Sequence, residues 1–124
     1  MLSSFPLVTV IPVRNIKASK NFYADKLDLD LIEGKESAIG FKCGDCTKLY
    51  IYNQKVEKEE HSVAIFVVKD IENVVNRLKK RGVQFKEYND SNLVTKNSIA
   101  QLKGEKAAWI IDPDGNILGL SEAE

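Results

Sequence analysis

The sequence predicts an α+β fold made of two βαβββ modules, and three observations support this prediction. The motif Val-Arg-Asn-Ile at residues 13–16 recurs as Val-Lys-Asp-Ile at residues 68–71, each time where a strand-like run meets a helical pattern. In both halves at least two further strand-like segments follow. A turn motif, Asp-Pro-Asp-Gly-Asn at residues 112–116, joins two apolar runs into a closing hairpin. A βαβββ unit cannot bury its own apolar face, so we expect the two modules to pack together.

The first module covers about residues 6–53. It opens with a β-branched run at 7–13, in which Pro12 cannot donate to a ladder and therefore belongs near the end or at an edge. Asn15 is a suitable N-cap for a helix that we expect to end between residues 26 and 29. Three strand-like segments follow, the first with a turn at its end. They are residues 31–32 with the turn at 33–35, residues 38–43, and residues 48–52, the last two joined at Gly44-Asp45.

A charged connector at about 54–60 precedes the second module, which covers about residues 61–120. A strand is predicted at 61–68, and Asp70 is the predicted N-cap of a helix whose apolar stripe has helical spacing. Gly82 is the expected residue just beyond the helix C-terminus. A strand begins at residues 83–85, and residues 99–102 are a further strand candidate within a polar segment. The apolar stripe consists of Ile71, Val74, Val75 and Leu78.

Composition argues for an ordinary globular protein. The chain of 124 residues is 44% hydrophobic and 29% charged, with 18 basic and 18 acidic side chains. This balance gives no net field that would recruit nucleic acid or an anionic membrane. No apolar run approaches the ~20 residues of a membrane span, and the first residues lack a signal-peptide pattern. We therefore expect a cytoplasmic protein without nucleic-acid or membrane partners.

The two repeated motifs, the Phe-Tyr pair at 22–23 and the closing hairpin resemble the vicinal oxygen chelate superfamily, which includes glyoxalase I, extradiol dioxygenases and bleomycin-resistance proteins. The resemblance runs from Val8 to Leu120. It implies a curled mixed sheet around a cleft, with the helices on the outer face. Asp28 stands where family members usually have glycine.

Strand side chains alternate between the two faces of a sheet, and the more apolar set should pack on the helices. This rule assigns Leu7, Ile11, Val13, Leu49 and Ile51 to the helix side of the first module. It leaves a mostly apolar and aromatic set for the cleft, suited to a flat or hydrophobic small molecule. The predicted ligand-binding residues are Tyr50, Tyr52, His61, Val63, Ile65, Trp109 and Ile111. The alternative is that these side chains fill the cleft and nothing binds.

In metal-using members of the family, four strand positions supply the metal ligands. By the resemblance these positions are Val8, Tyr50, Val63 and Gly119 here. Valine and glycine side chains donate no lone pair, and a neutral phenol is a poor ligand. We therefore predict no metal and no other cofactor, and we assign no catalytic residue.

Two further motifs favour ordinary structural roles. His61, the only histidine, shares the alternation of Val63 and is a candidate for orienting a ligand, although a surface position is the alternative. Cys43 and Cys46 bracket the Gly-Asp turn, and too few partners exist for a structural zinc site. They are expected to be free thiols, with reversible disulfide formation as the alternative.

The function that these observations favour is sequestration or sensing of an apolar or aromatic compound without metal, by a twofold homodimer. The alternatives are a metal-dependent lyase, isomerase or dioxygenase of the same superfamily, which would use relocated ligands such as His61, and a structural homodimer whose cleft is closed.

Overall fold

The computed structural model describes residues 1–34, 37–55 and 61–124. The chain divides into two compact units, Met1–Glu57 and Lys58–Glu124. This division falls within the predicted connector, of which residues 56–60 lie outside the described part. Within the described residues, no helix is long and apolar enough to cross a membrane.

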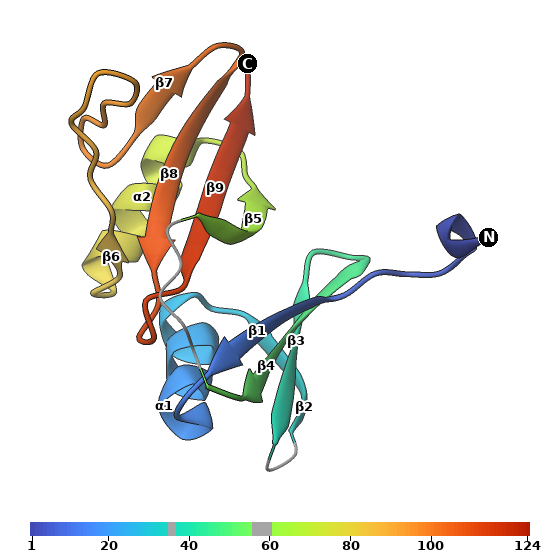
Figure 1. Cartoon of the computed structure of the whole chain (residues 1–124). Coiled ribbons are helices and arrows are strands. Elements are labelled where there is room, and N and C mark those ends of the chain that lie inside the picture. The colour runs from blue at the N-terminus through green and yellow to red at the C-terminus, as the bar shows by residue number, and fades with distance from the viewer. Residues whose placement is uncertain (35–36, 56–60) are drawn as a thin grey trace. The chain divides into compact units, whose positions relative to one another are not determined.

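The first unit is a four-stranded mixed sheet with one helix packed on it (Figure 1). The strand order is β1-β4-β3-β2, with β1 parallel to β4 and the other pairs antiparallel. Pro12 thus lies on an edge strand, as expected for a residue without a backbone donor. The strands are β1 (Thr9–Val13), β2 (Asp30–Gly34), β3 (Ala38–Cys43) and β4 (Thr47–Asn53).

Helix α1 (Ile16–Asn21) continues into a π-helical segment, Phe22–Lys26. Asn15 caps it as predicted, because its side-chain oxygen accepts the backbone N–H of Ala18 at 3.1 Å. The helical run ends at Leu27, and Asp28 follows with φ 60°. The glycine that the resemblance implies at this position therefore has a conformational reason, since a side chain is disfavoured in the left-handed region.

The core of the first unit lies between α1 and one face of the sheet. Tyr23 is fully buried and its ring lies 6.0 Å from that of Phe41. Ile11, Leu49 and Ile51 are buried on the same face, as the alternation predicted. Leu7 was predicted to join them, and this is wrong: it precedes β1 and is 90% exposed.

The second unit is a five-stranded mixed sheet with helix α2 packed on β8 and β9 (Figure 1). The order is β5-β9-β8-β6, with β7 also paired to β8, and the β5–β9 pair is parallel. The two units thus share a βαβ-type frame with additional antiparallel strands, and the predicted fold class is confirmed. The elements are β5 (Ser62–Val67), α2 (Ile71–Lys80), β6 (Gln84–Phe85), β7 (Ala100–Leu102), β8 (Glu105–Ile111) and β9 (Ile117–Ala123).

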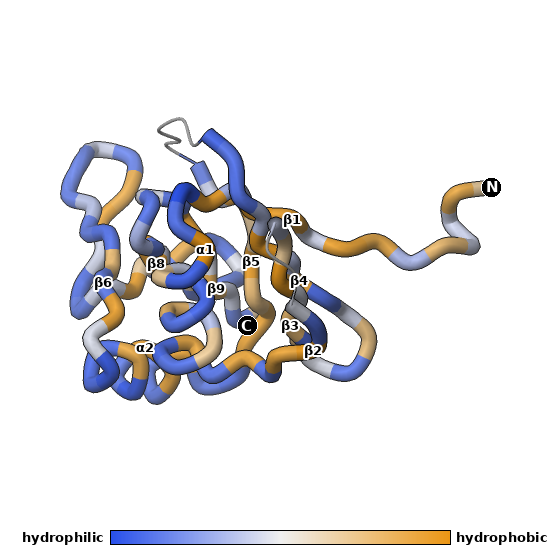
Figure 2. Tube along the Cα trace, turned by 90° about the horizontal axis from the view of Figure 1, so that it is seen from below, coloured by the Kyte–Doolittle hydropathy of each residue, from blue (hydrophilic) through white to orange (hydrophobic). Residues whose placement is uncertain are grey.

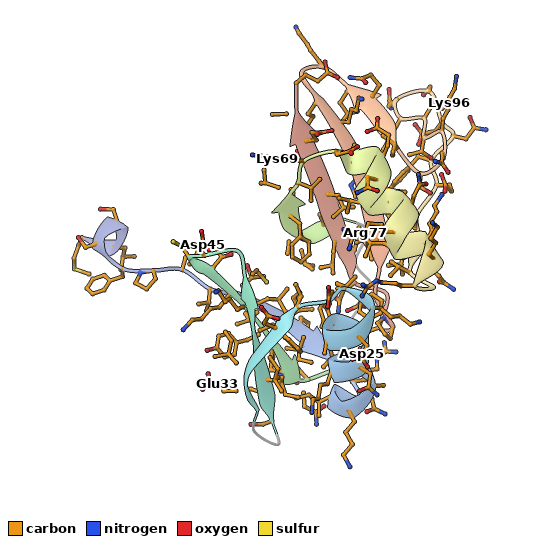
Figure 3. All side chains as sticks on the ribbon, turned by 180° about the vertical axis from the view of Figure 1, so that it is seen from behind. Asp25, Glu33, Asp45, Lys69, Arg77 and Lys96 are labelled. Atoms are coloured by element: carbon orange, nitrogen blue, oxygen red, sulfur yellow. The ribbon has the colours of Figure 1, made fainter. Side chains whose placement is uncertain are left out.

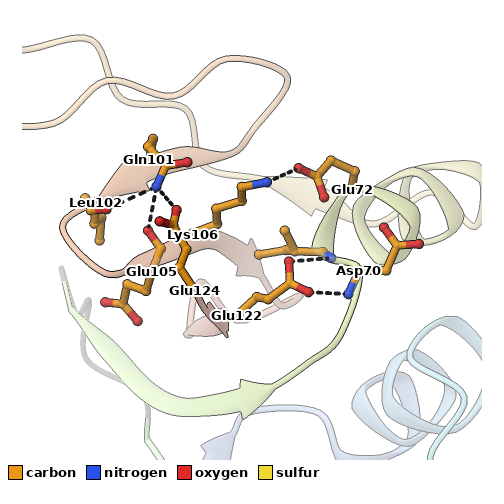
Figure 4. A network of polar contacts seen from close by, with 9 residues as sticks. Asp70, Glu72, Gln101, Leu102, Glu105, Lys106, Glu122 and Glu124 are labelled. Atoms are coloured by element: carbon orange, nitrogen blue, oxygen red, sulfur yellow. Dashed lines mark hydrogen bonds and ion pairs between the residues drawn. The ribbon is translucent and has the colours of Figure 1, made fainter.

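Helix α2 is amphipathic, and Figure 2 shows hydrophobic and hydrophilic residues alternating along it. Ile71 and Val75 are fully buried, and Gly82 with φ 83° follows the helix. Asp70 stands at the predicted N-cap position, but its side chain makes no capping hydrogen bond. The carboxylate of Glu122 on β9 accepts the backbone N–H groups of Asp70 and Ile71 instead (Figure 4).

The closing hairpin forms as predicted. Asp112 is almost fully buried, and its carboxylate accepts the backbone N–H groups of Asp114 and Asn116 at 2.9 and 2.8 Å. It also accepts the side-chain amide of Asn116 at 2.9 Å. Gly115 has φ 88°, a left-handed conformation that glycine adopts at no steric cost. The turn therefore satisfies its own polar groups while it joins β8 to β9.

Candidate functional site

Each sheet has one face opposite its helix, which we call the helix-free face. In the first unit this face carries a row of four residues, one from each strand. Val10 pairs with Tyr50, Tyr50 with Gly40, and Gly40 with Glu33. Leu49 and Ile51, which flank Tyr50 in β4, point into the core on the other side.

A hydrogen bond joins the two polar members of this row. The Tyr50 hydroxyl donates to Glu33 Oε1 at 2.6 Å. Figure 3 shows Glu33 on the side of β2 that faces away from α1. The tyrosine ring reaches across β3 because Gly40 has no side chain: a Cβ there would lie 2.6 Å from Tyr50 Cε2. The glycine therefore makes the Tyr50–Glu33 contact possible.

The Tyr50–Glu33 contact also changes the acidity of the phenol. The hydrogen bond to Glu33 is the largest cause that raises the pKa of Tyr50, followed by desolvation and the repulsion between phenolate and carboxylate. Each of these effects favours the neutral, protonated phenol. Tyr50 is therefore held as a hydrogen-bond donor to Glu33.

The rows on either side of this one differ in character. Toward one end, Tyr52 pairs with Pro12 and Ala38, and this row is apolar and aromatic. Toward the other end, Lys48 pairs with Lys42, which pairs with Asp30. The helix-free face of the first unit thus runs from an aromatic end, through Tyr50 and Glu33, to a charged end.

The second unit has an equivalent row. Ile65 pairs with Gly119 and Gly119 with Trp109. The number of residues from Val10 to Ile65 equals the number from the start of the first repeated motif to the start of the second. This equal spacing supports the internal repeat. Trp109 is half-buried and its ring makes an edge-to-face contact with Tyr88, with ring centroids 5.0 Å apart. The ammonium group of Lys86 lies 5.3 Å from the Tyr88 ring centroid.

A register shift interrupts β5 between Ser62 and Ala64. Strict alternation would place Val63 on the face of Ile65, but the groups that approach Gly119 are Ile65 Cγ1 and Ser62 Oγ. They would lie 3.1 and 3.4 Å from a Cβ at Gly119. His61 is exposed and precedes the strand.

Apart from His61 and Val63, the predicted ligand-binding residues therefore form two groups, one on each sheet. Tyr50 and Tyr52 share the face of β4, and Ile65, Trp109 and Ile111 lie on β5 and β8. Sequence reasoning missed Glu33, which was assigned to a turn but lies within β2, and Tyr88, which lies in a segment without periodicity. The rest of that predicted turn includes Lys35, which lies outside the described residues.

A separate groove of about 500 Å³ lies in the second unit, on the side that α2 covers. Glu72 and Lys106, which line it, form an ion pair at 2.8 Å (Figure 4). The lining residues do not include any of the predicted ligand-binding residues. The groove is thus a different surface from the helix-free face.

The four positions that resemblance assigns to metal ligands do not fit a metal ion. Val8 is exposed and precedes β1, Val63 is apolar, and Gly119 lies beneath Ile65. The hydrogen bond to Glu33 raises the pKa of Tyr50 and so favours the neutral phenol, whereas metal ligation favours the phenolate. Among the described residues no three histidine, cysteine or acidic side chains are grouped to hold an ion.

The two cysteines are free thiols beside the β3–β4 turn. Cys43 is half-buried, and this burial raises the pKa of its thiol. A raised pKa lowers the thiolate fraction and with it the reactivity of the sulfur. The structure thus favours the ordinary structural role for Cys43.

The chain thus contains two sheets, each with a parallel pairing of its first and last strands and with an aromatic residue on its helix-free face. This repeat defines an α+β protein of two similar modules. The chain belongs to the glyoxalase/bleomycin resistance protein/dioxygenase superfamily, whose family model matches residues 6–120. Comparison with curated proteins gave no significant match.

Solved structures support the same fold. A glyoxalase family protein from Enterococcus faecalis is 22% identical, with a TM-score of 0.73, covering 98% of this chain and 100% of that one. A lactoylglutathione lyase from Agrobacterium tumefaciens is 17% identical, with a TM-score of 0.70 and coverages of 96% and 93%. The fosfomycin resistance protein FosX from Listeria monocytogenes is 12% identical, with a TM-score of 0.74 and coverages of 97% and 93%.

Proposed function

We propose that this protein binds a small apolar or aromatic compound, which it sequesters or senses, without using a metal ion. The observation that carries the proposal is the composition of the helix-free faces. They combine half-buried aromatic side chains, Tyr50, Tyr52 and Trp109, with exposed aliphatic ones such as Val10 and Ile65. Apolar surface of this kind is costly to expose unless a ligand or partner covers it.

The absence of donors at the ligand positions favours binding over metal-assisted turnover. Three of the four positions, Val8, Val63 and Gly119, have no side-chain lone pair, and Tyr50 is already hydrogen-bonded to Glu33. A divalent ion would gain too little from one neutral phenol to offset the loss of its water shell. Proteins of similar fold include one named as a lyase, which supports the enzyme alternative, and one named as a fosfomycin resistance protein.

The binding proposal is tested by titrating the protein with naphthalene derivatives and following the fluorescence of Trp109, the single tryptophan. Binding should perturb the emission and saturate. Calorimetry should then show that Trp109→Ala weakens binding by ~1–3 kcal/mol, the range for losing a large aromatic contact at a hot spot. Val94→Ala, which truncates an exposed aliphatic side chain elsewhere in the unit, serves as the control. Unchanged affinity in a folded Trp109→Ala protein would remove Trp109 from the site.

The metal-free part of the proposal has its own test. Protein purified without added metal is challenged with zinc, nickel, manganese and iron(II), and bound metal is measured by elemental analysis. We expect substoichiometric metal throughout. Stoichiometric metal that is lost in a His61→Ala variant would establish a relocated ligand, and loss in a Tyr50→Phe variant would establish Tyr50 as a ligand. Either result would support the enzyme alternative.

We also propose that the protein acts as a twofold homodimer, because closed twofold assemblies dominate among soluble oligomers. Sedimentation equilibrium at micromolar concentration should give twice the mass of the 13.9 kDa chain. A mass of one chain over the whole concentration range would contradict the proposal.

A further inference from the structure

The Tyr50–Glu33 pair leaves a distinctive set of hydrogen-bonding groups on the helix-free face of the first unit. The phenol has one proton, and it is donated to Glu33 Oε1 at 2.6 Å. The groups still available to a ligand are the lone pairs of the phenol oxygen and of the carboxylate. An ionised carboxylate can only accept hydrogen bonds. The pair therefore offers acceptors and no donor to a molecule on this face.

The backbone fixes this arrangement. Glu33 and Tyr50 both pair with Gly40, from opposite sides of β3. A bulge between Leu31 and Glu33 shifts β2 by one residue, and this shift brings Glu33 opposite Gly40. Because a Cβ at Gly40 would lie 2.6 Å from Tyr50 Cε2 and 3.0 Å from Cζ, the ring can cross β3 only over glycine. Bulge and glycine together place the two side chains in contact.

We infer that the Tyr50–Glu33 pair, seated over Gly40, recognises a hydrogen-bond donor on the ligand, and that the ligand class is an aromatic or apolar amine in its ammonium form. This inference rests on the proposed function and names its ligand class. The aromatic part of such a ligand lies against the row of Tyr52 and Pro12, where stacking is available. Its ammonium group meets the carboxylate of Glu33, an interaction that the exposure of Glu33 keeps moderate.

Two neighbouring lysines would favour a different ligand, an aromatic carboxylate. Lys48 and Lys42 lie opposite each other two residues further along β4 and β3, on the same face. Like charges directly opposite each other on a sheet are destabilising. The two ammonium groups would therefore attract an anion. An aromatic carboxylate would use these lysines in place of Glu33, so the charge of the preferred probe distinguishes the two possibilities.

The test compares two probes of the same shape, 2-naphthylmethylamine and 2-naphthoate, titrated into ¹⁵N-labelled protein at pH 7. The amine should bind about three- to tenfold more tightly than the carboxylate and shift the amide signals of Gly40 and Tyr50. Glu33→Gln should abolish this preference while it keeps the side-chain shape. Asp30→Asn, which removes a carboxylate from the same strand and face, should retain it.

Gly40→Ala should also abolish the preference, since it displaces the tyrosine ring. If Gly40→Ala fails to fold, the amine preference measured in Glu33→Gln alone tests the inference. A carboxylate preference, or an amine preference that survives in Glu33→Gln, overturns the inference and leaves the proposed function intact. If neither probe binds saturably, both the inference and the proposed function are overturned.

Discussion

Glu122, near the end of the chain, caps the helix that begins after Asp70. Its two carboxylate oxygens accept the N–H groups of Asp70 and Ile71 at 2.5 and 3.3 Å (Figure 4). Asp70 itself has φ 54° and makes no side-chain cap. The last strand of the second unit thus satisfies the first amides of α2 and adds negative charge at the positive end of the helix.

Removing this cap should destabilise the second unit. Glu122→Ala is expected to lower the free energy of unfolding by about 1 kcal/mol, within the ~0.5–2 kcal/mol range for capping residues. Urea unfolding followed by circular dichroism measures the change. Glu122→Gln keeps an acceptor oxygen and should recover most of the loss. An alanine variant as stable as the wild type would show that solvent caps the helix equally well.

The closing hairpin should depend on Asp112 more than on the proline beside it. Asp112→Ala leaves the buried side-chain amide of Asn116 without this acceptor and removes two backbone contacts. We expect a loss of about 2–3 kcal/mol, as for hydrogen bonds to a charged group. Pro113→Ala, at an exposed position, should cost less than about 1 kcal/mol. Chemical unfolding of both variants tests the order, and a larger effect of Pro113→Ala would contradict it.

Glu87 should make part of the stability depend on pH. The Ser98 hydroxyl, and after it the Thr95 hydroxyl, donates to the carboxylate and holds its pKa below the ordinary value of 4.5. Because the folded-state pKa is depressed, the stabilisation is complete above the unfolded pKa and is lost as pH falls through the folded one.

Thermal unfolding between pH 6 and pH 3 measures this contribution. The melting temperature of wild-type protein should fall more steeply with acidification than that of Glu87→Gln. Asp45→Asn, in the exposed β3–β4 turn, removes one carboxylate elsewhere and should keep the wild-type slope. Equal slopes for wild type and Glu87→Gln would refute the prediction.

Tyr50 should ionise at a higher pH than an ordinary tyrosine. Its pKa is raised above 10.0, first by the hydrogen bond to Glu33 and then by desolvation. The neutral phenol therefore stabilises the folded state below the unfolded pKa, and this stabilisation is lost as pH rises through the folded one. Titration of ¹³Cζ-labelled tyrosine by NMR, with Tyr50→Phe for assignment, follows the group directly. Glu33→Gln should lower the titration midpoint, and an unchanged midpoint would exclude Glu33 as the cause.

Simple alternation was sufficient where strands are regular. It placed Leu49 and Ile51 in the core and Tyr50 on the opposite face, because β4 pairs with both neighbours without a register shift. The closing hairpin could also be predicted from the sequence, because the conformation of a turn depends on its own residues. Asp112 and Gly115 each have a defined conformational role in it.

Alternation failed where a bulge interrupts a strand. Unbroken pairing of β2 would place Glu33 opposite Ile39, on the core side, whereas the observed register places it opposite Gly40. A charged residue at a core-facing position was the available signal, because a bulge resolves that conflict by moving the side chain to the other face. The register shift between Ser62 and Ala64 in β5 likewise breaks the alternation.

Tyr88 could not be found from local pattern. It lies in a stretch outside the helices, where its backbone N–H donates to the Thr95 hydroxyl at 2.9 Å and its ring contacts Trp109. Two consecutive residues with positive φ, Asn97 and Ser98, turn this stretch back on itself. Neither is glycine, so the usual sequence signal of such a turn is absent.

Gly119 is a crowded position at which to install a metal-binding glutamate. A glutamate there would bring a Cβ to 3.1 Å from Ile65 Cγ1, so the isoleucine has to move before a carboxylate can project. The first mutation alone would bring crowding without coordination, because Val8 and Val63 still lack donors. A metal site at these four positions thus requires several substitutions at once. Redesign should begin by truncating Ile65 and only then install the ligand set.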